Sequence, residues 1–124
     1  MTREAGPPLE PNLIQAYGDG RFRINAVHHA GPLVVGRDFL APWPIGSLDE
    51  ATADGLAILN DRTPAVELLL LGCGAGIRPV PAALRAGLKA WNIAVEPMDT
   101  GAACRTYNVL LLEERRVAAA LLPV

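Results

Sequence analysis

Hydrophobic and polar residues alternate near the start of the chain and predict a β-hairpin. Within 21–27, Phe22 and Ile24 alternate with arginine and asparagine, and the glycine-rich stretch 18–20 separates this segment from 13–17. Alternation with a period of two is typical of a strand with one buried face, and short glycine-containing turns join antiparallel strands. We therefore expect the first two strands at 13–17 and 21–27.

The next region predicts shorter and less regular strands. The apolar stretch 33–35 indicates one short strand, and 39–45 indicates an irregular segment at a sheet edge. Pro42 and Pro44 flank Trp43 there. A residue before proline is pushed towards extended geometry, and proline donates no hydrogen bond to a neighbouring strand. We interpret Trp43 as a core side chain that fills a gap from this edge.

Helical spacing of apolar residues predicts a first helix over 47–60. Ser47 and Glu50 match a capping box, in which each side chain accepts a hydrogen bond from a free amide at the helix start. The apolar residues that recur near helical spacing are Leu48, Ala51, Leu56 and Leu59.

From there, strand and helix patterns alternate to the end of the chain. The apolar run 66–71 is typical of a strand covered on both faces, and 81–91 follows as a helix. A strand at 93–95, a helix at 99–112 and a last strand at 117–122 complete the pattern. An antiparallel start followed by alternating elements predicts an α/β fold of three layers with a mixed sheet. The pattern does not determine the order of the strands.

Composition fits one compact domain and excludes several classes of protein. The chain has 124 residues, of which 51% are hydrophobic, and we expect a single domain at 13–124 preceded by a flexible, proline-containing arm at 1–12. A net charge of −2 without charged blocks argues against nucleic-acid binding. The apolar run 68–77 is too short to span a bilayer, and the start of the chain resembles neither a secretory signal nor a mitochondrial presequence. We expect a soluble cytoplasmic protein.

Residues that commonly bind metals are not grouped in this sequence. Cys73 and Cys104 are 31 positions apart and form no CxxC pair, so we expect neither a zinc site nor a disulfide framework. His28 and His29 are adjacent, and neighbouring side chains on a strand face opposite ways, so we do not expect them to bind one metal ion together. We interpret them as turn or surface residues. No metal ion and no cofactor are predicted.

A glycine-rich motif ends the strand at 66–71 and has two interpretations. The sequence 68–76, with alternating glycines, resembles the loop of S-adenosylmethionine-dependent methyltransferases, and Glu96 ends the next strand where a ribose hydroxyl would be held. However, leucine stands at position 70, where those enzymes usually have an acid. The segment 77–81 also separates the glycines from the next helix, and too few residues remain for that larger fold. A structural turn that needs small residues is the favoured interpretation.

The helix at 99–112 carries most of the unusual polar chemistry. Asp99 or Thr100 is expected to cap its first turn. Helical side chains lean towards the amino end, so we expect Arg105 to pair with Asp99 or Glu96. The predicted buried stripe consists of Ala103, Tyr107, Leu110 and Leu111.

These elements together predict a crevice at the carboxyl edge of the sheet. If the strands at 66–71 and 93–95 are parallel, 72–78 lies beside 96–100. Cys104 beside an arginine has the surroundings that stabilise a thiolate, but the sequence places no histidine as its base, so no residue is predicted to be catalytic. The residues expected to line this crevice are Cys73, Gly74, Arg78, Glu96, Asp99, Thr100, Cys104, Arg105 and Asn108.

The same stretches carry a family resemblance. From Ile14 to Leu122, the sequence resembles the family of small uncharacterised proteins that includes the mitochondrial complex I assembly factor 3. Its carrying segments are Gly72-Cys73-Gly74, 95–100, 102–110 and 113–117. Glu114 departs from the family pattern, which commonly has glycine between the acid and the arginine.

The resemblance implies a three-layer α/β fold, no established enzymatic activity and, in the mitochondrial branch, assistance to complex I assembly. Because no presequence is evident, we expect a bacterial member. The leading hypothesis is a non-enzymatic interaction protein whose partner is a subunit of a respiratory or other membrane complex. The alternative is a small-ligand protein or enzyme that uses the predicted crevice.

Overall fold

The computed structural model describes residues 10–124, in which two β-sheets and two α-helices are formed. The predicted flexible arm at 1–12 lies mostly outside the described residues. The strands are β1 (Ile14–Gly18), β2 (Arg21–Ile24), β3 (Val27–Ala30), β4 (Leu33–Gly36), β5 (Phe39–Pro42), β6 (Leu68–Gly72), β7 (Ala94–Met98) and β8 (Val117–Leu121). The α-helices are α1 (Ala82–Ala90) and α2 (Thr100–Leu112), and two 3₁₀ segments are η1 (Leu48–Glu50) and η2 (Ala53–Leu59).

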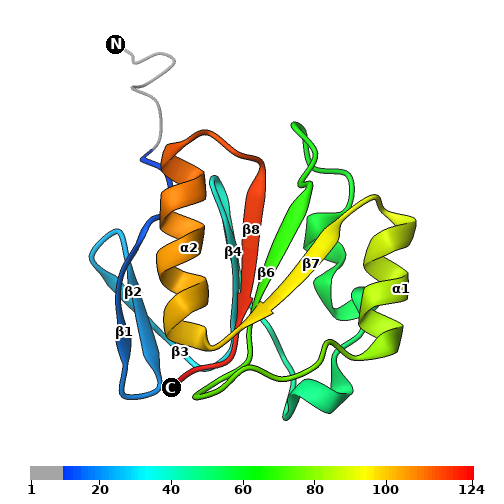
Figure 1. The fold of residues 1–124 in the computed structure, drawn as a ribbon. Helices are drawn as coiled ribbons and strands as arrows, with labels where there is room; N and C mark the ends of the chain where they lie inside the picture. The colour runs from blue at the N-terminus through cyan, green and yellow to red at the C-terminus, as the bar shows by residue number, and fades with distance from the viewer. Residues whose placement is uncertain (1–9) are drawn as a thin grey trace.

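The central layer is a five-stranded mixed sheet of order β5-β4-β8-β6-β7. Strand β6 is parallel to β7 and β8, whereas β4 is antiparallel to β5 and β8. The chain crosses from β6 to β7 through α1 and returns past β6 to β8 through α2. Since such crossovers are right-handed, steps in opposite directions place the two helices on opposite faces of the sheet (Figure 1). The predicted three-layer α/β fold is confirmed.

Strand alternation divides the core into two clusters, one on each face of the central sheet. Leu69 and Leu71 of β6 pack on the side of α1 and the 3₁₀ segments. Leu70 packs on the side of α2 and the β1–β3 sheet. In β8, three consecutive alanines at 118–120 are fully buried, so their small side chains let layers on both faces approach closely. No helix within residues 10–124 has the length and hydrophobicity to cross a bilayer.

The predicted hairpin is confirmed, but its second strand, expected over 21–27, ends at Ile24, and a third strand follows. Gly20 and Asp19 form the turn between β1 and β2 with positive φ. A second tight turn at Asn25 and Ala26, also with positive φ, leads into β3, which pairs with β2. The structure therefore places the two histidines, interpreted from the sequence as turn or surface residues, in an outer strand.

The edge segment agrees with its prediction. Strand β5 lies at one edge of the central sheet and ends at Pro42. Trp43 follows it and is buried, as expected for a core side chain. Its indole N–H has no hydrogen-bond partner among the described residues.

The predicted first helix at 47–60 is wrong. Two 3₁₀ segments, η1 and η2, replace it, because Ala51 between them is extended and Leu56 interrupts η2 with non-helical angles. The predicted capping box is also absent: Ser47 makes no capping hydrogen bond, and the Glu50 carboxylate accepts from the Gly46 amide instead. The apolar residues that match helical spacing are therefore buried by two short 3₁₀ segments and not by one α-helix.

Candidate functional site

The carboxyl ends of β6, β7 and β8 meet at one edge of the central sheet, at the bottom of Figure 1. The expected parallel pairing of β6 and β7 is confirmed. The Cys73 amide donates to the Met98 carbonyl at 2.8 Å, and the Thr100 amide donates to the Gly74 carbonyl at 2.8 Å. The loops that follow the two strands are therefore hydrogen-bonded to each other.

Thr100 is the fully buried centre of this junction. Its Oγ1 accepts from the Gly74 amide at 2.9 Å and donates to the Leu122 carbonyl at 2.6 Å, so one hydroxyl joins three chain segments. A Cβ at Gly72 would lie 3.2 Å from the Thr100 Cα and 2.8 Å from Leu121 Cδ2. A larger residue at position 72 would therefore be crowded by its neighbours, which supports the structural interpretation of the glycine motif.

The start of α2 resolves two expectations. Asp99 is the N-cap, because its Oδ1 accepts from the Ala102 amide at 2.9 Å. The expected pairing of Arg105 with Asp99 or Glu96 is wrong: within the described part of the chain, Arg105 forms no ion pair with either carboxylate. Its Nη1 instead donates to the Tyr17 hydroxyl at 2.7 Å, because Arg105 lies on the flank of α2 that faces β1.

Two further side chains of α2 hold the three-stranded sheet. The Asn108 amide group accepts from the Ile14 N–H and donates to the Ile14 carbonyl, both at 2.8 Å, as a neighbouring strand would. The buried Tyr107 hydroxyl donates to the Asn12 carbonyl at 2.8 Å. The polar residues of this helix thus act largely as structural contacts between layers.

Neither cysteine has the surroundings of a nucleophile. Cys104 is 1% exposed, and burial raises the pKa of its thiol to about 12, which outweighs the opposite effect of Arg105. The stabilised thiolate considered from the sequence is therefore not favoured. Cys73 is also buried, and its Sγ lies 3.6 Å from the Leu71 carbonyl oxygen and 3.7 Å from that of Arg78.

The remaining predicted residues do not converge on these groups. Arg78 pairs with the exposed Asp49 at 3.2 Å. Glu96 lies in a separate hollow beside Arg85 and Lys89 of α1. Within residues 10–124, no group of three or more histidine, cysteine or acidic side chains is placed to hold a metal ion. A functional crevice at this edge stays a prediction.

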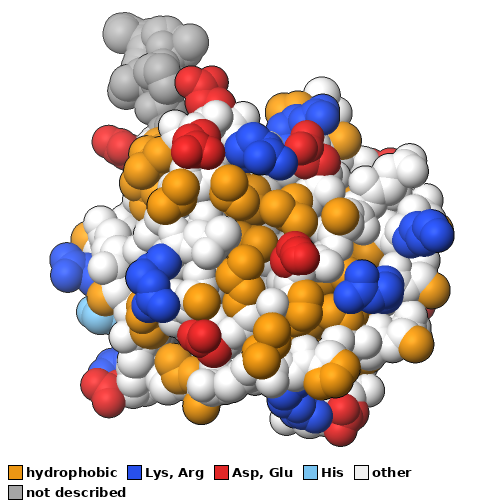
Figure 2. Space-filling model, in the orientation of Figure 1, with side chains coloured by type: hydrophobic (Ala, Val, Ile, Leu, Met, Phe, Trp, Pro, Cys, Tyr) orange, Lys and Arg blue, Asp and Glu red, His pale blue; other side chains and the backbone are white. Residues whose placement is uncertain are grey.

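A pocket of about 210 Å³ lies at the opposite end of the central strands, where β6 and β8 begin. The sequence did not predict it. It is formed where β4 turns into β5, where the chain enters β6, and where α2 is followed by β8. Figure 2 shows basic and acidic side chains together at this end, at the top of the view. Its lining residues are Arg37, Asp38, Phe39, Arg62, Thr63, Pro64, Val66, Glu114, Arg115, Arg116 and Val117.

The nearest sequence signal for this pocket is the charged run 113–116 directly before the last strand. Arg62 and Asp38 contribute from two other segments, and their ion pair at 3.1 Å forms only in the folded chain. Local periodicity does not reveal such a grouping, because it depends on strand order.

Comparison with known proteins connects this fold to a family. Residues 14–122 match a family described as a protein of unknown function (DUF498/DUF598). An uncharacterized protein of Rhodobacter capsulatus is 42% identical over 122 residues, which cover 94% of this chain and 93% of that protein.

Two further proteins have informative similarities. The Danio rerio protein named NADH dehydrogenase (ubiquinone) 1 alpha subcomplex assembly factor 3 is 36% identical over 111 residues, which cover 90% of this chain and 64% of that protein. A crystal structure of a Bartonella henselae protein, described as an outer membrane protein, superposes with a TM-score of 0.83 at 34% identity. That match covers 93% of this chain and 97% of the other.

Proposed function

The chain belongs to the DUF498/DUF598 family, and from this membership we propose that it is a non-enzymatic interaction protein that helps assemble a respiratory membrane complex. The observation that carries the proposal is the similarity to an assembly factor for NADH dehydrogenase over 90% of this chain. Because the chain spans only 64% of that relative, the activity of the whole relative comes to this chain as a proposal.

An apolar surface on the outside of α2 and β7 supports a protein partner. Val109 and Leu112 are 54% and 66% exposed and lie one helical turn apart. Leu110 of α2 and Met98 of β7 are partly buried next to the core. Figure 2 shows hydrophobic side chains gathered over these two elements. We define the α2–β7 surface as Met98, Val109, Leu110 and Leu112. Contiguous exposed apolar side chains commonly mark protein interaction sites.

Affinity capture from native cells tests this proposal. The wild-type chain is expected to recover a subunit of a respiratory complex reproducibly. A double variant, Val109→Ser with Leu112→Ser, is expected to lose that subunit, because it removes the most exposed apolar side chains of the α2–β7 surface. Ile77→Ser is the matched control, since Ile77 is 68% exposed in the loop between β6 and α1.

Failure of the wild-type chain to recover any respiratory subunit would count against the function itself. Recovery by the wild type and equally by the double variant would retain the function and reject the α2–β7 surface. Folding of each variant is checked by its urea unfolding midpoint, which exposed serine substitutions should change little.

A further inference from the structure

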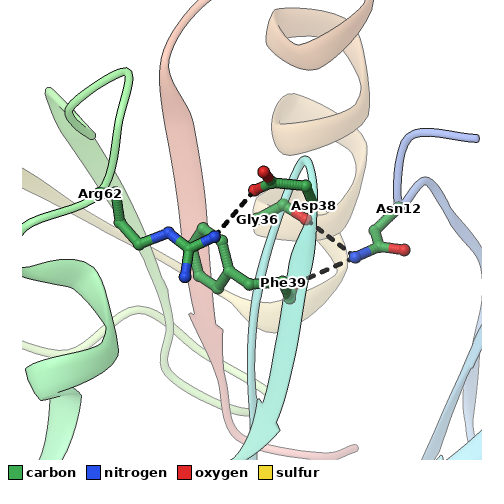
Figure 3. Close-up of polar contacts among 5 residues, drawn as sticks. All are labelled: Asn12, Gly36, Asp38, Phe39 and Arg62. Atoms are coloured by element: carbon green, nitrogen blue, oxygen red, sulfur yellow. Dashed lines mark hydrogen bonds and ion pairs between the residues drawn. The ribbon is translucent and has the colours of Figure 1, made fainter. Parts of the chain in front are cut away.

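The Phe39 ring forms the floor of the pocket at the amino ends of β6 and β8. The Phe39 ring lies across Gly36, its cross-strand partner, and any Cβ at position 36 would overlap that ring. The Arg62 guanidinium carbon lies 4.3 Å from the centre of this ring, and Figure 3 shows the guanidinium group against the ring. Cation–π stacking and the ion pair to Asp38 hold this arginine over the floor.

The turn between β4 and β5, which holds Phe39, is also held by hydrogen bonds from other parts of the chain. The Asn12 amide nitrogen donates to the carbonyls of Gly36 and Phe39, each at 3.1 Å. Arg37 donates to the Leu111 carbonyl at 2.9 Å, which connects the same turn to the end of α2. This part of the pocket is therefore preorganised, which lowers the entropy cost of binding.

Positive charge is in excess around the pocket. Four arginines line it, whereas Asp38 and Glu114 line it and Glu67 contacts its rim, which leaves a net charge of +1. Glu67 is shared between two arginines, and the hydrogen bond from Arg116 is the main cause that lowers the pKa of its carboxyl group. The rim arginines Arg115 and Arg116 have side chains about half exposed, at 50% and 52%. Since a guanidinium has five N–H donors, these groups can bind a further anion.

Size and lining define the class of ligand. Typical small-molecule pockets have roughly 300–1,000 Å³, so a pocket of about 210 Å³ suits only a small molecule or the end of a chain. Val66, Val117 and Phe39 provide apolar wall beside the guanidinium groups. A net charge of one matches a monoanion better than a phosphate dianion, and the planar fork of arginine fits a carboxylate.

We propose that this pocket binds a carboxylate that carries a small apolar group, with Arg62 and Arg116 contacting the carboxylate and Phe39 and Val117 contacting the apolar group. Two sources have this chemistry: a free organic acid and the carboxyl-terminal residue of another polypeptide. This binding activity does not depend on the assembly role.

Nuclear magnetic resonance titration of the ¹⁵N-labelled chain tests the proposal, with phenylacetate as the probe and neutral phenylacetamide as its isostere. Phenylacetate is expected to cause saturable shifts of amides at 37–39 and 114–117, and phenylacetamide is expected to cause none. Arg62→Gln and Arg116→Gln should each weaken binding about tenfold or more, the loss expected for one charge-assisted hydrogen bond. Arg78→Gln is the control, because the Arg78 side chain is about as exposed as that of Arg116, at 49% and 52%, and forms its ion pair with Asp49 outside this pocket.

A short peptide ending in leucine, with either a free or an amidated carboxyl terminus, distinguishes the sources. Saturation by the free-terminus peptide alone would identify a chain end as the ligand, and saturation by phenylacetate would identify a free acid; either outcome supports the pocket. Absence of saturable shifts with both carboxylates overturns it, as does equal binding of phenylacetamide. If one arginine variant does not fold, unchanged affinity of the other would also overturn the proposal.

Discussion

Glu114, which departs from the pattern expected of the family, has a backbone conformation that favours glycine. It follows α2 with φ of +62°, in the left-handed region that favours glycine. The Glu114 amide donates to the Leu111 carbonyl, and the Arg115 amide donates to the Leu110 carbonyl, which is the hydrogen bonding of a glycine-type helix end. Glycine is therefore the residue that fits this turn best.

Glu114→Gly is expected to stabilise the protein. A non-glycine residue in this conformation costs roughly 1–2 kcal/mol, and the greater freedom of glycine in the unfolded chain offsets part of that. We predict a rise of about 0.5–1 kcal/mol in the free energy of unfolding, measured by urea denaturation. Glu113→Gly, at a φ of −86°, is the control and should destabilise. Equal effects of the two substitutions would contradict this explanation.

The buried thiol of Cys104 leads us to expect that the free energy of unfolding falls at alkaline pH. Its thiol pKa is about 12 in the folded chain, against an ordinary value of 9.0. Above pH 9.0 the unfolded chain therefore loses this proton first, so the stabilisation is complete below that pH and falls as the pH rises towards 12. The decline from this group is up to roughly 1.4 kcal/mol per pH unit.

Urea midpoints measured between about pH 8 and about pH 11 test this titration. The wild type should lose more stability over that interval than Cys104→Ala, which has no thiol to titrate. Burial also raises the pKa of Tyr107, but that effect is common to both proteins. Parallel declines in the wild type and the variant would show that the thiol has no part in it.

At the scale of elements, the sequence predicted best those segments whose own residues determine their structure. The apolar run at β6 and the capped start of α2 contain enough local information to define a strand and a helix. The segment 47–60 does not: its apolar residues match helical spacing, yet contact with the core is achieved by η1 and η2. The strand order and the arginine-lined pocket depend on long-range pairing, so local patterns could not predict them.

Asn108 determines how firmly one element, the three-stranded sheet, is attached to α2. Asn108→Ala removes both hydrogen bonds to Ile14 and should cost about 1–3 kcal/mol. We expect amide hydrogen exchange to accelerate in β1 and β2 more than in β6, because opening would be confined to the outer sheet. Thr106→Ala, two residues earlier in α2, is the control. Acceleration spread evenly over both sheets would contradict a local attachment.

At the scale of the whole molecule, the two ends of the central strands differ in what their side chains do. The carboxyl edge, where the sequence placed its candidate crevice, has Thr100 and Asp99 engaged in contacts that join loops and cap α2. The opposite edge has the arginine-lined pocket, and the α2–β7 surface presents exposed apolar side chains between them. This distribution supports the proposal that the protein acts by binding a partner through the α2–β7 surface.

Complementation tests that claim most directly. The chain, directed to mitochondria, is expressed in cells that lack complex I assembly factor 3, and intact NADH dehydrogenase complex is quantified by native electrophoresis. We predict that the wild-type chain and Ile77→Ser restore the intact complex, whereas Val109→Ser with Leu112→Ser does not. Folded wild-type chain that accumulates in mitochondria without restoring any of the complex would contradict the proposed assembly function.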